Sequence, residues 1–153
     1  KIMDNFGLID VLEQYCTDND IKFLYGDNFY QNIEASSYEY EADQLVMGAD
    51  FNARPVRATG GKILSIDYVG AIALGRKFET PDLSNPDGVA SLDETYIQKY
   101  KRRLKDLSQL LSNIVGEIAC NNELETTGED MRFDINKFDT NIDFVVMSLT
   151  FTQ

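Results

Sequence analysis

The chain has 153 residues and carries 26 acidic against 14 basic side chains, which gives a formal net charge of −12. This charge opposes binding to bare duplex nucleic acid or to an anionic membrane surface. The sequence contains no histidine, which removes the commonest general base and the commonest zinc ligand and excludes imidazole-based triads and most zinc sites.

A chain of this length fits a single domain, residues 1–153, with a self-sufficient hydrophobic core. Its first residues lack the apolar segment of a signal peptide, and no run approaches the roughly 20 apolar residues that span a bilayer. We therefore expect a soluble, unsecreted protein. Cys16 and Cys120 lie far apart on predicted helices and are expected to be two buried thiols rather than a disulfide.

The N-terminal part predicts a short helix and a short strand. Apolar residues recur at helical spacing over residues 4–18, with Asp4 or Asn5 available as a cap. The apolar run 21–25 is closed by Gly26-Asp27-Asn28, as expected of a strand that leads into a turn.

The middle of the chain predicts an extended β-hairpin. Its arms are Gln44–Arg57 and Lys62–Phe78, and Ala58-Thr59-Gly60-Gly61 lies between them with two glycines for a tight reversal. Gly70 and Gly75 are expected to mark bulges or bends in the second arm. Residues 79–91 are rich in Pro, Gly, Asp, Asn and Ser and predict a loop.

The most regular pattern in the chain runs from Leu92 to Ala119 and predicts one long amphipathic helix. Apolar residues recur there at alternating steps of three and four, with Leu107 and Leu111 in the middle of the stripe. Such a stripe must be buried, and the β-rich segments on either side are the obvious partners. The helix is therefore expected to back a sheet.

The C-terminal part predicts a closing hairpin after a polar link at residues 121–130. Residues 131–136 and 145–152 alternate between apolar and polar side chains, so each strand is expected to have one dry face. Together the elements predict an α+β fold, a mostly antiparallel sheet with a long hairpin packed against one long and one short helix.

Charged clusters are interpreted as surface features. A basic stretch in the long helix and an acidic stretch before the hairpin are candidates for pairing between subunits: Lys99, Lys101, Arg102, Arg103 and Lys105 with Glu39, Glu41 and Asp43. A second acidic group is expected to be solvated: Asp10, Glu13, Asp18 and Asp20. Five tyrosines are expected at a protein interface: Tyr25, Tyr30, Tyr38, Tyr40 and Tyr68.

No pattern of a catalytic, cofactor or metal site is complete. The acidic clusters lack the spacing and the glycine of a calcium loop. The glycines at 70 and 75 are followed by Arg76-Lys77 in a strand context, so a P-loop is excluded. We therefore predict no enzyme activity, no cofactor and no metal.

The order of elements over nearly the whole chain resembles the tail-terminator and neck-ring proteins of tailed bacteriophages. The most suggestive piece is the closing hairpin, in which Met131-Arg132-Phe133-Asp134-Ile135 turns through Asp139-Thr140-Asn141 into the run 144–151. The resemblance implies a structural virion protein, assembled in the bacterial host cytoplasm. It also implies a homo-oligomeric ring, usually of six copies, that joins the tail tube to neck and head completion proteins.

The acidic charge is compatible with such a ring, because a repelling lumen lets DNA pass without specific binding. The long hairpin is also similar to tail-tube and injection-machine subunits. Two interpretations from other classes stay open: a small bacterial α+β domain that binds a ligand between sheet and helix, and a hydrolase with paired carboxylates.

Overall fold

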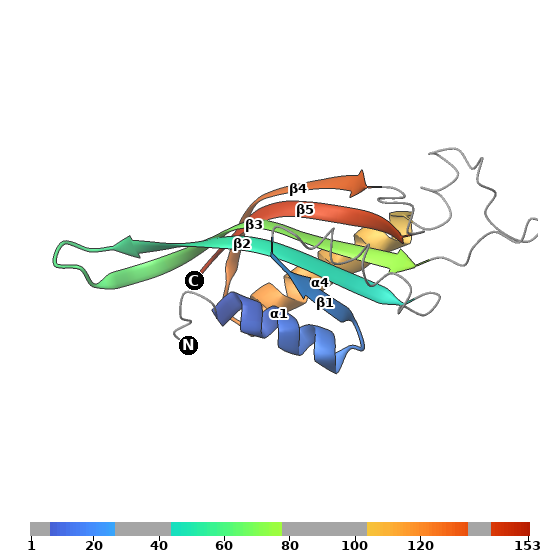
Figure 1. Cartoon of the computed structure of the whole chain (residues 1–153). Helices are drawn as coiled ribbons and strands as arrows, with labels where there is room; N and C mark the ends of the chain where they lie inside the picture. The colour runs from blue at the N-terminus through green and yellow to red at the C-terminus, as the bar shows by residue number, and fades with distance from the viewer. Residues whose placement is uncertain (1–6, 27–43, 78–103, 135–141) are drawn as a thin grey trace, which may run out of the picture.

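The computed structural model describes residues 7–26, 44–77, 104–134 and 142–153 (Figure 1). It has two helices and five strands in these ranges, which confirms the predicted α+β class. The elements are α1 (Gly7–Asp18), β1 (Lys22–Tyr25), β2 (Leu45–Arg57), β3 (Ile63–Lys77), α4 (Lys105–Asn121), β4 (Glu125–Asp134) and β5 (Ile142–Thr152).

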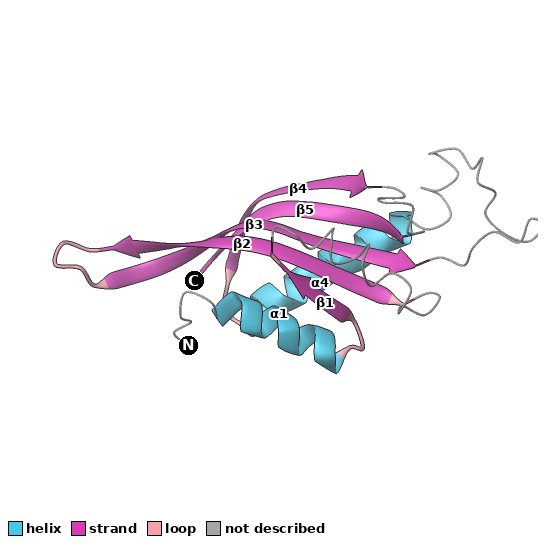
Figure 2. Ribbon diagram, in the orientation of Figure 1, coloured by secondary structure: helices cyan, strands magenta, loops and turns pink. Residues whose placement is uncertain are grey.

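The five strands form one sheet in the order β1-β2-β3-β5-β4. β1 runs parallel to β2, whereas the other neighbouring pairs are antiparallel. Both helices lie on the same side of this sheet (Figure 2). The strand that we predicted at residues 21–25 is therefore an edge strand, and β4 forms the opposite edge.

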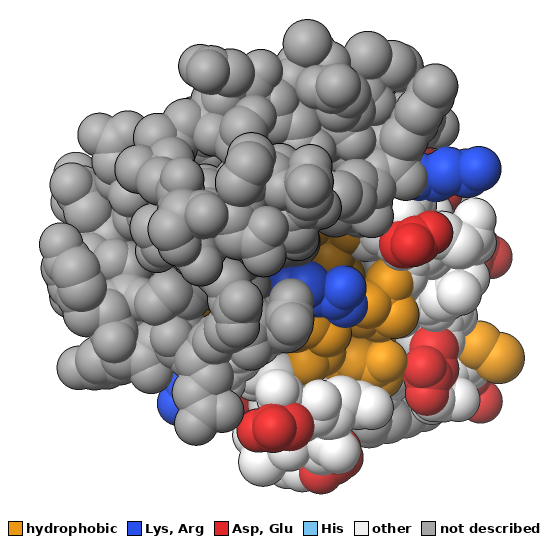
Figure 3. Space-filling model, turned by 90° about the vertical axis from the view of Figure 1, so that its right-hand side faces the viewer, with side chains coloured by type: hydrophobic (Ala, Val, Ile, Leu, Met, Phe, Trp, Pro, Cys, Tyr) orange, Lys and Arg blue, Asp and Glu red, His pale blue; other side chains and the backbone are white. Residues whose placement is uncertain are grey.

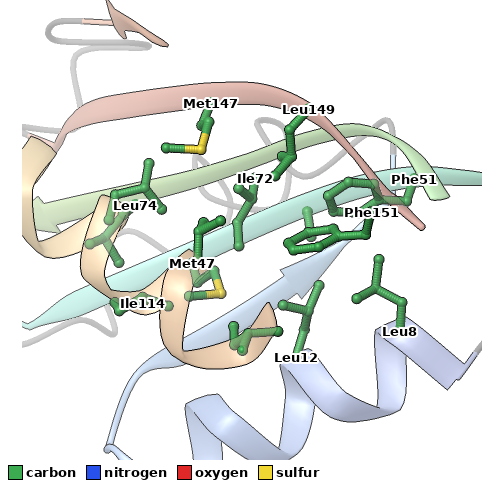
Figure 4. Packing of buried hydrophobic residues seen from close by; sticks show 14 of the residues in the cluster. Leu8, Leu12, Met47, Phe51, Ile72, Leu74, Ile114, Met147, Leu149 and Phe151 are labelled. Carbon is green, nitrogen blue, oxygen red and sulfur yellow. The ribbon is translucent and has the colours of Figure 1, made fainter. Parts of the chain in front are cut away.

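The main core lies between the two helices and the sheet (Figure 4). α4 turns Leu107, Leu111 and Ile114 toward the strands, and α1 contributes Leu8 and Leu12. The stripe expected to back the sheet does so within residues 104–121, because a 3.6-residue period keeps these side chains on one face. The earlier part of the predicted helix, residues 92–103, lies outside the described residues.

The far side of the sheet carries a second buried cluster. It consists of Val46, Ala73, Ile142, Phe144 and Val146. β5 alternates between the two clusters and is buried at every position from 142 to 147. The expectation of one dry face is thus wrong for β5, because an inner strand covered on both sides reads as a continuous apolar run.

The predicted polar link at residues 121–130 is wrong over its second half, where β4 begins at Glu125. Glu125 lies opposite Thr152 of β5, and the register shifts between Thr127 and Asp130, with Gly128 at a φ of 66°. An edge strand tolerates charged side chains and a bulge, since both discourage unwanted pairing. Such a strand lacks the alternation of apolar and polar side chains from which strands are predicted.

Gly70 and Gly75 do not mark bulges, because β3 keeps its register with β2 and β5 through both positions. They permit close approach instead. A Cβ at Gly70 would overlap the backbone of Asp50 on β2, and one at Gly75 would lie 2.5 Å from the ring of Phe144. Glycine is required wherever another chain segment comes this near.

We expect Gly70→Ala to lower the free energy of unfolding by about 1–3 kcal/mol, since the backbone of β2 must move to admit a methyl group. Gly116→Ala is the matched control, because nothing lies within 4 Å of a Cβ at that helical position. It should be neutral or stabilising. Urea unfolding of both variants measures the difference, and equal stability would contradict the close approach.

Candidate interaction surface

Residues 55–66 form a two-stranded ribbon that projects beyond the body of the protein, and we call it the arm (Figure 1). The neighbouring strands end at its base. The last pair between β1 and β2 is Tyr25 with Ala49, and β5 ends where Thr152 pairs with Asp67. Among the described residues, both outer edges of the arm therefore lack a strand partner.

The tip of the arm is the reversal predicted from the glycine pair. Ala58 N–H donates to Lys62 O at 2.9 Å, and Gly61 N–H donates to Ala58 O at 3.0 Å. Gly60 and Gly61 have φ angles of 98° and 88°, which favour glycine. The guanidinium of Arg57 donates to Gly61 O at 2.7 Å and so holds its charge at the tip.

The arm and its base carry the exposed large hydrophobic side chains of the described residues. Val56, Ile63 and Leu64 are 43%, 40% and 64% exposed. Tyr25, 41% exposed, lies at the base, where its hydroxyl donates to Phe51 O at 3.2 Å. An isolated two-stranded ribbon is marginally stable in water, and clustered exposed apolar side chains mark interaction sites. The arm is therefore the best candidate for a binding surface.

The arm is also basic. Residues 55–66 contain Arg57 and Lys62 and no acidic residue, although the whole chain has a net charge of −12. At the base of the arm, Arg54 lies opposite Asp67. A surface that combines positive charge with apolar side chains is suited to an acidic partner with apolar patches of its own. This acid-free window was visible in the sequence, but it does not reveal that the ribbon leaves the sheet.

The helices form an acidic surface, in contrast to the basic arm. Residues 7–21 and 106–131 contain no lysine or arginine. Acidic side chains are prominent among the described residues at the end of the molecule opposite the arm (Figure 3). Asp10, Glu13, Asp18 and Asp20 are all exposed, which confirms their predicted place on the surface.

An open groove of about 360 Å³ lies between α1 and the last turns of α4, and we call it the helix groove. It is lined by Asp10, Val11, Gln14, Tyr15, Asp18, Ile118, Asn121 and Asn122. Beside it, the Tyr15 hydroxyl donates to Glu117 Oε2 at 3.2 Å. Burial and the Glu117 carboxylate raise the pKa of Tyr15, so this phenol stays neutral.

The helix groove lies at the C-terminal ends of both helices. The groove includes residues from the last turns of both helices, and neither last turn holds a basic residue. Carbonyl groups at a helix C-terminus carry partial negative charge and attract cations. The groove is thus an acidic surface with apolar contacts supplied by Val11, Tyr15 and Ile118.

Most of the predicted intersubunit residues lie outside the described residues. This holds for Lys99, Lys101, Arg102, Arg103, Glu39, Glu41 and Asp43. Lys105 is exposed at the first position of α4, so it is accessible for pairing. Their mutual pairing stays a prediction.

The five tyrosines predicted at an interface do not share one environment. Tyr68 is 1% exposed and belongs to the main core, so the interface prediction is wrong for it. Its strand position turns it toward the helices, together with Ile66 and Ile72. Tyr25 remains a surface residue, and Tyr30, Tyr38 and Tyr40 lie outside the described residues.

A buried carboxylate, Asp143, lies directly opposite Arg76 across the pairing of β3 with β5. Residues that face each other across an antiparallel pair share a face of the sheet, so the two charges are neighbours. We interpret these two neighbouring residues as structural.

The described residues hold no group of three or more Cys, Asp or Glu side chains that could bind a metal ion. Within the same ranges, no helix has both the length and the apolar character needed to cross a membrane.

The two cysteines differ in environment, which corrects the expectation of two buried thiols. Cys16 is buried, its thiol lies 3.4 Å from Met47 Sδ, and burial raises its pKa to about 12. Cys120 is exposed. It lies two residues beyond Ile118, which on a helix points it away from the buried stripe.

We expect native protein at pH 8 to react with a thiol reagent at Cys120 alone, because reaction requires an accessible thiolate. Cys16 should react only after denaturation. Cys120→Ser should abolish the native reaction, as followed by absorbance and by mass spectrometry of the labelled peptides. Rapid native labelling of Cys16 would contradict its buried environment.

No protein-family model matches this chain, and no curated protein matches it.

Proposed function

We propose that this chain is a non-enzymatic structural subunit that assembles with copies of itself into a ring at the phage neck or at the end of the tail tube. The observation that carries the proposal is the arm, which combines exposed Val56, Ile63 and Leu64 with two strand edges that have no strand partner in the described part of the chain. A surface of this kind favours aggregation in a monomer. A closed assembly buries it in every copy.

The proposed role in a phage rests on the resemblance in element order and on the acidic net charge. An acidic chain supplies a lumen through which DNA passes without being held. The resemblance implies six copies, contacts with the tail tube and neck proteins, and a place in the virion. A tail-tube or injection-machine subunit is the neighbouring alternative, since its strands also join around a lumen.

The described residues give the other two alternatives less support. A ligand site beneath α4 would need space where Leu107, Leu111 and Ile114 pack against the sheet with 0–3% exposure. A carboxylate hydrolase would need two acids at a separation of about 5–9.5 Å. Asp10 and Asp18 of the helix groove lie eight positions apart on α1, a rise of about 12 Å.

Electron microscopy of the concentrated protein at low salt tests the proposal. We expect closed rings with a central channel. A mobility assay with duplex DNA should show no retention by these rings, because the acidic chain repels phosphates. Fields that hold only single subunits or open fibres, or rings that retain DNA, would contradict the proposed function.

A further inference from the structure

We infer that the arm of one copy docks into the helix groove of the next copy. The inference rests on the self-assembly proposed above and names the two surfaces that meet. The groove lies between α1 and the end of α4, and the arm belongs to β2 and β3, so the contact joins two different regions of the same chain.

Charge complementarity supports this pairing. The arm carries two basic residues, Arg57 and Lys62, and no acidic one, whereas the groove is lined by Asp10 and Asp18 and no basic residue. The C-terminal ends of two helices add partial negative charge at the same place. Lys62 is close to the tip of the arm, and an ammonium group on a flexible stem is suited to reach such a site.

Apolar complementarity supports it as well. The exposed side chains near the tip are Val56, Ile63 and Leu64, and the groove offers Val11, Tyr15 and Ile118. Leu64 is the most exposed of the three and lies at the register shift, where Arg57 pairs with Ile63 and Val56 with Ser65. A bulged residue is turned out of the ladder, which leaves its side chain available to a partner.

The arm projects beyond the strands that flank it, which makes its tip accessible to another copy. Residues 55–57 of β2 extend past the last pair of β5, and three strand residues span about 10 Å before the turn. A contact between two different surfaces leaves one free arm and one free groove on every open chain of subunits. Closing the row of subunits into a ring places the free arm in the free groove.

Two other occupants are conceivable for the arm. A second arm would give a symmetric dimer, but two basic ribbons repel each other. Duplex DNA would attract the basic residues, but the body behind the arm is strongly acidic. The experiments below distinguish a second arm and duplex DNA from the helix groove as the partner of the arm.

Disulfide trapping tests the docking in a chain whose exposed Cys120 is replaced by serine. Gln14→Cys places an exposed thiol in the lining of the groove, and Thr59→Cys places one at the exposed tip of the arm. Under mild oxidation at low salt, we expect a ladder of linked oligomers that disappears on reduction. Peptide mapping should identify the link between positions 14 and 59.

The matched control moves the acceptor thiol away from the groove. Gln109→Cys in place of Gln14→Cys puts an exposed thiol on α4 12 positions before Asn121, a distance of about 18 Å, and should not give the ladder. Thr59→Cys with Cys120→Ser and no acceptor cysteine should stay unlinked. Cysteine-linked dimers of that chain would show arm against arm and would overturn the docking.

Charge exchange gives an independent readout. Arg57→Glu with Lys62→Glu should weaken self-association about tenfold or more, since close charge pairs at interfaces are strongly coupled. Asp10→Lys with Asp18→Lys in the same chain should restore it. Failure of this restoration, or retention of duplex DNA through the arm, would also overturn the docking.

The outcomes separate the two proposals. Rings that form normally but never link position 59 to position 14 would overturn the docking site and leave self-assembly standing. A protein that stays monomeric at every concentration and salt would overturn both.

Discussion

Replacing Leu111 by alanine is expected to lower the free energy of unfolding by about 2–5 kcal/mol. Leu111 is 0% exposed, lies in the middle of α4 and belongs to the core between helices and sheet. The cost combines the lost burial of the side chain with the cavity that remains, because neighbouring side chains relax only partly.

Ser112→Ala is the control for this substitution, since the next residue of the same helix is exposed. It should change stability by less than about 0.5 kcal/mol. Urea unfolding at high salt, where self-association is weakest, measures both variants. A loss below about 0.5 kcal/mol for Leu111→Ala would mean that the stripe does not face the core.

Replacing Val56, Ile63 and Leu64 together by threonine is expected to raise the dissociation constant between copies by about 30-fold or more. These side chains are exposed in the single chain and would be buried in the assembly. Threonine is β-branched and therefore suits a strand, and it removes apolar surface. Sedimentation of the variant against the parent measures the change.

The same variant should unfold with nearly unchanged free energy, because exposed side chains contribute little to the fold of one subunit. The arm variant is thus expected to change the dissociation constant between copies without changing the free energy of unfolding. Leu111→Ala is expected to lower the free energy of unfolding of the single subunit. An arm variant that assembles as tightly as the parent would exclude these three side chains as contacts.

Periodicity explains what the sequence could predict. The stripe through Leu107 and Leu111 indicated a helix that backs a sheet, and the Gly60-Gly61 pair indicated the hairpin reversal. These signals are local, since each depends on residues a few positions apart. The first half of β4 was missed because an edge strand with charged side chains has no such signal.

The arm could not be predicted from its own residues. Its outline is set by the last pairs of two other strands, Tyr25 with Ala49 and Asp67 with Thr152, and these pairings are not local in sequence. The helix groove depends likewise on how α1 lies against the end of α4. Strand pairing and helix packing decide which residues stay exposed, so the candidate site required the structure.

The solution mass of the intact protein across concentration and salt tests self-assembly most directly. The account predicts a closed oligomer at low salt that dissociates into folded monomers as salt rises from about 0.1 M to about 1 M, where the screening length falls from about 10 Å to about 3 Å. A strict monomer at every concentration and salt, with the arm intact, would contradict it.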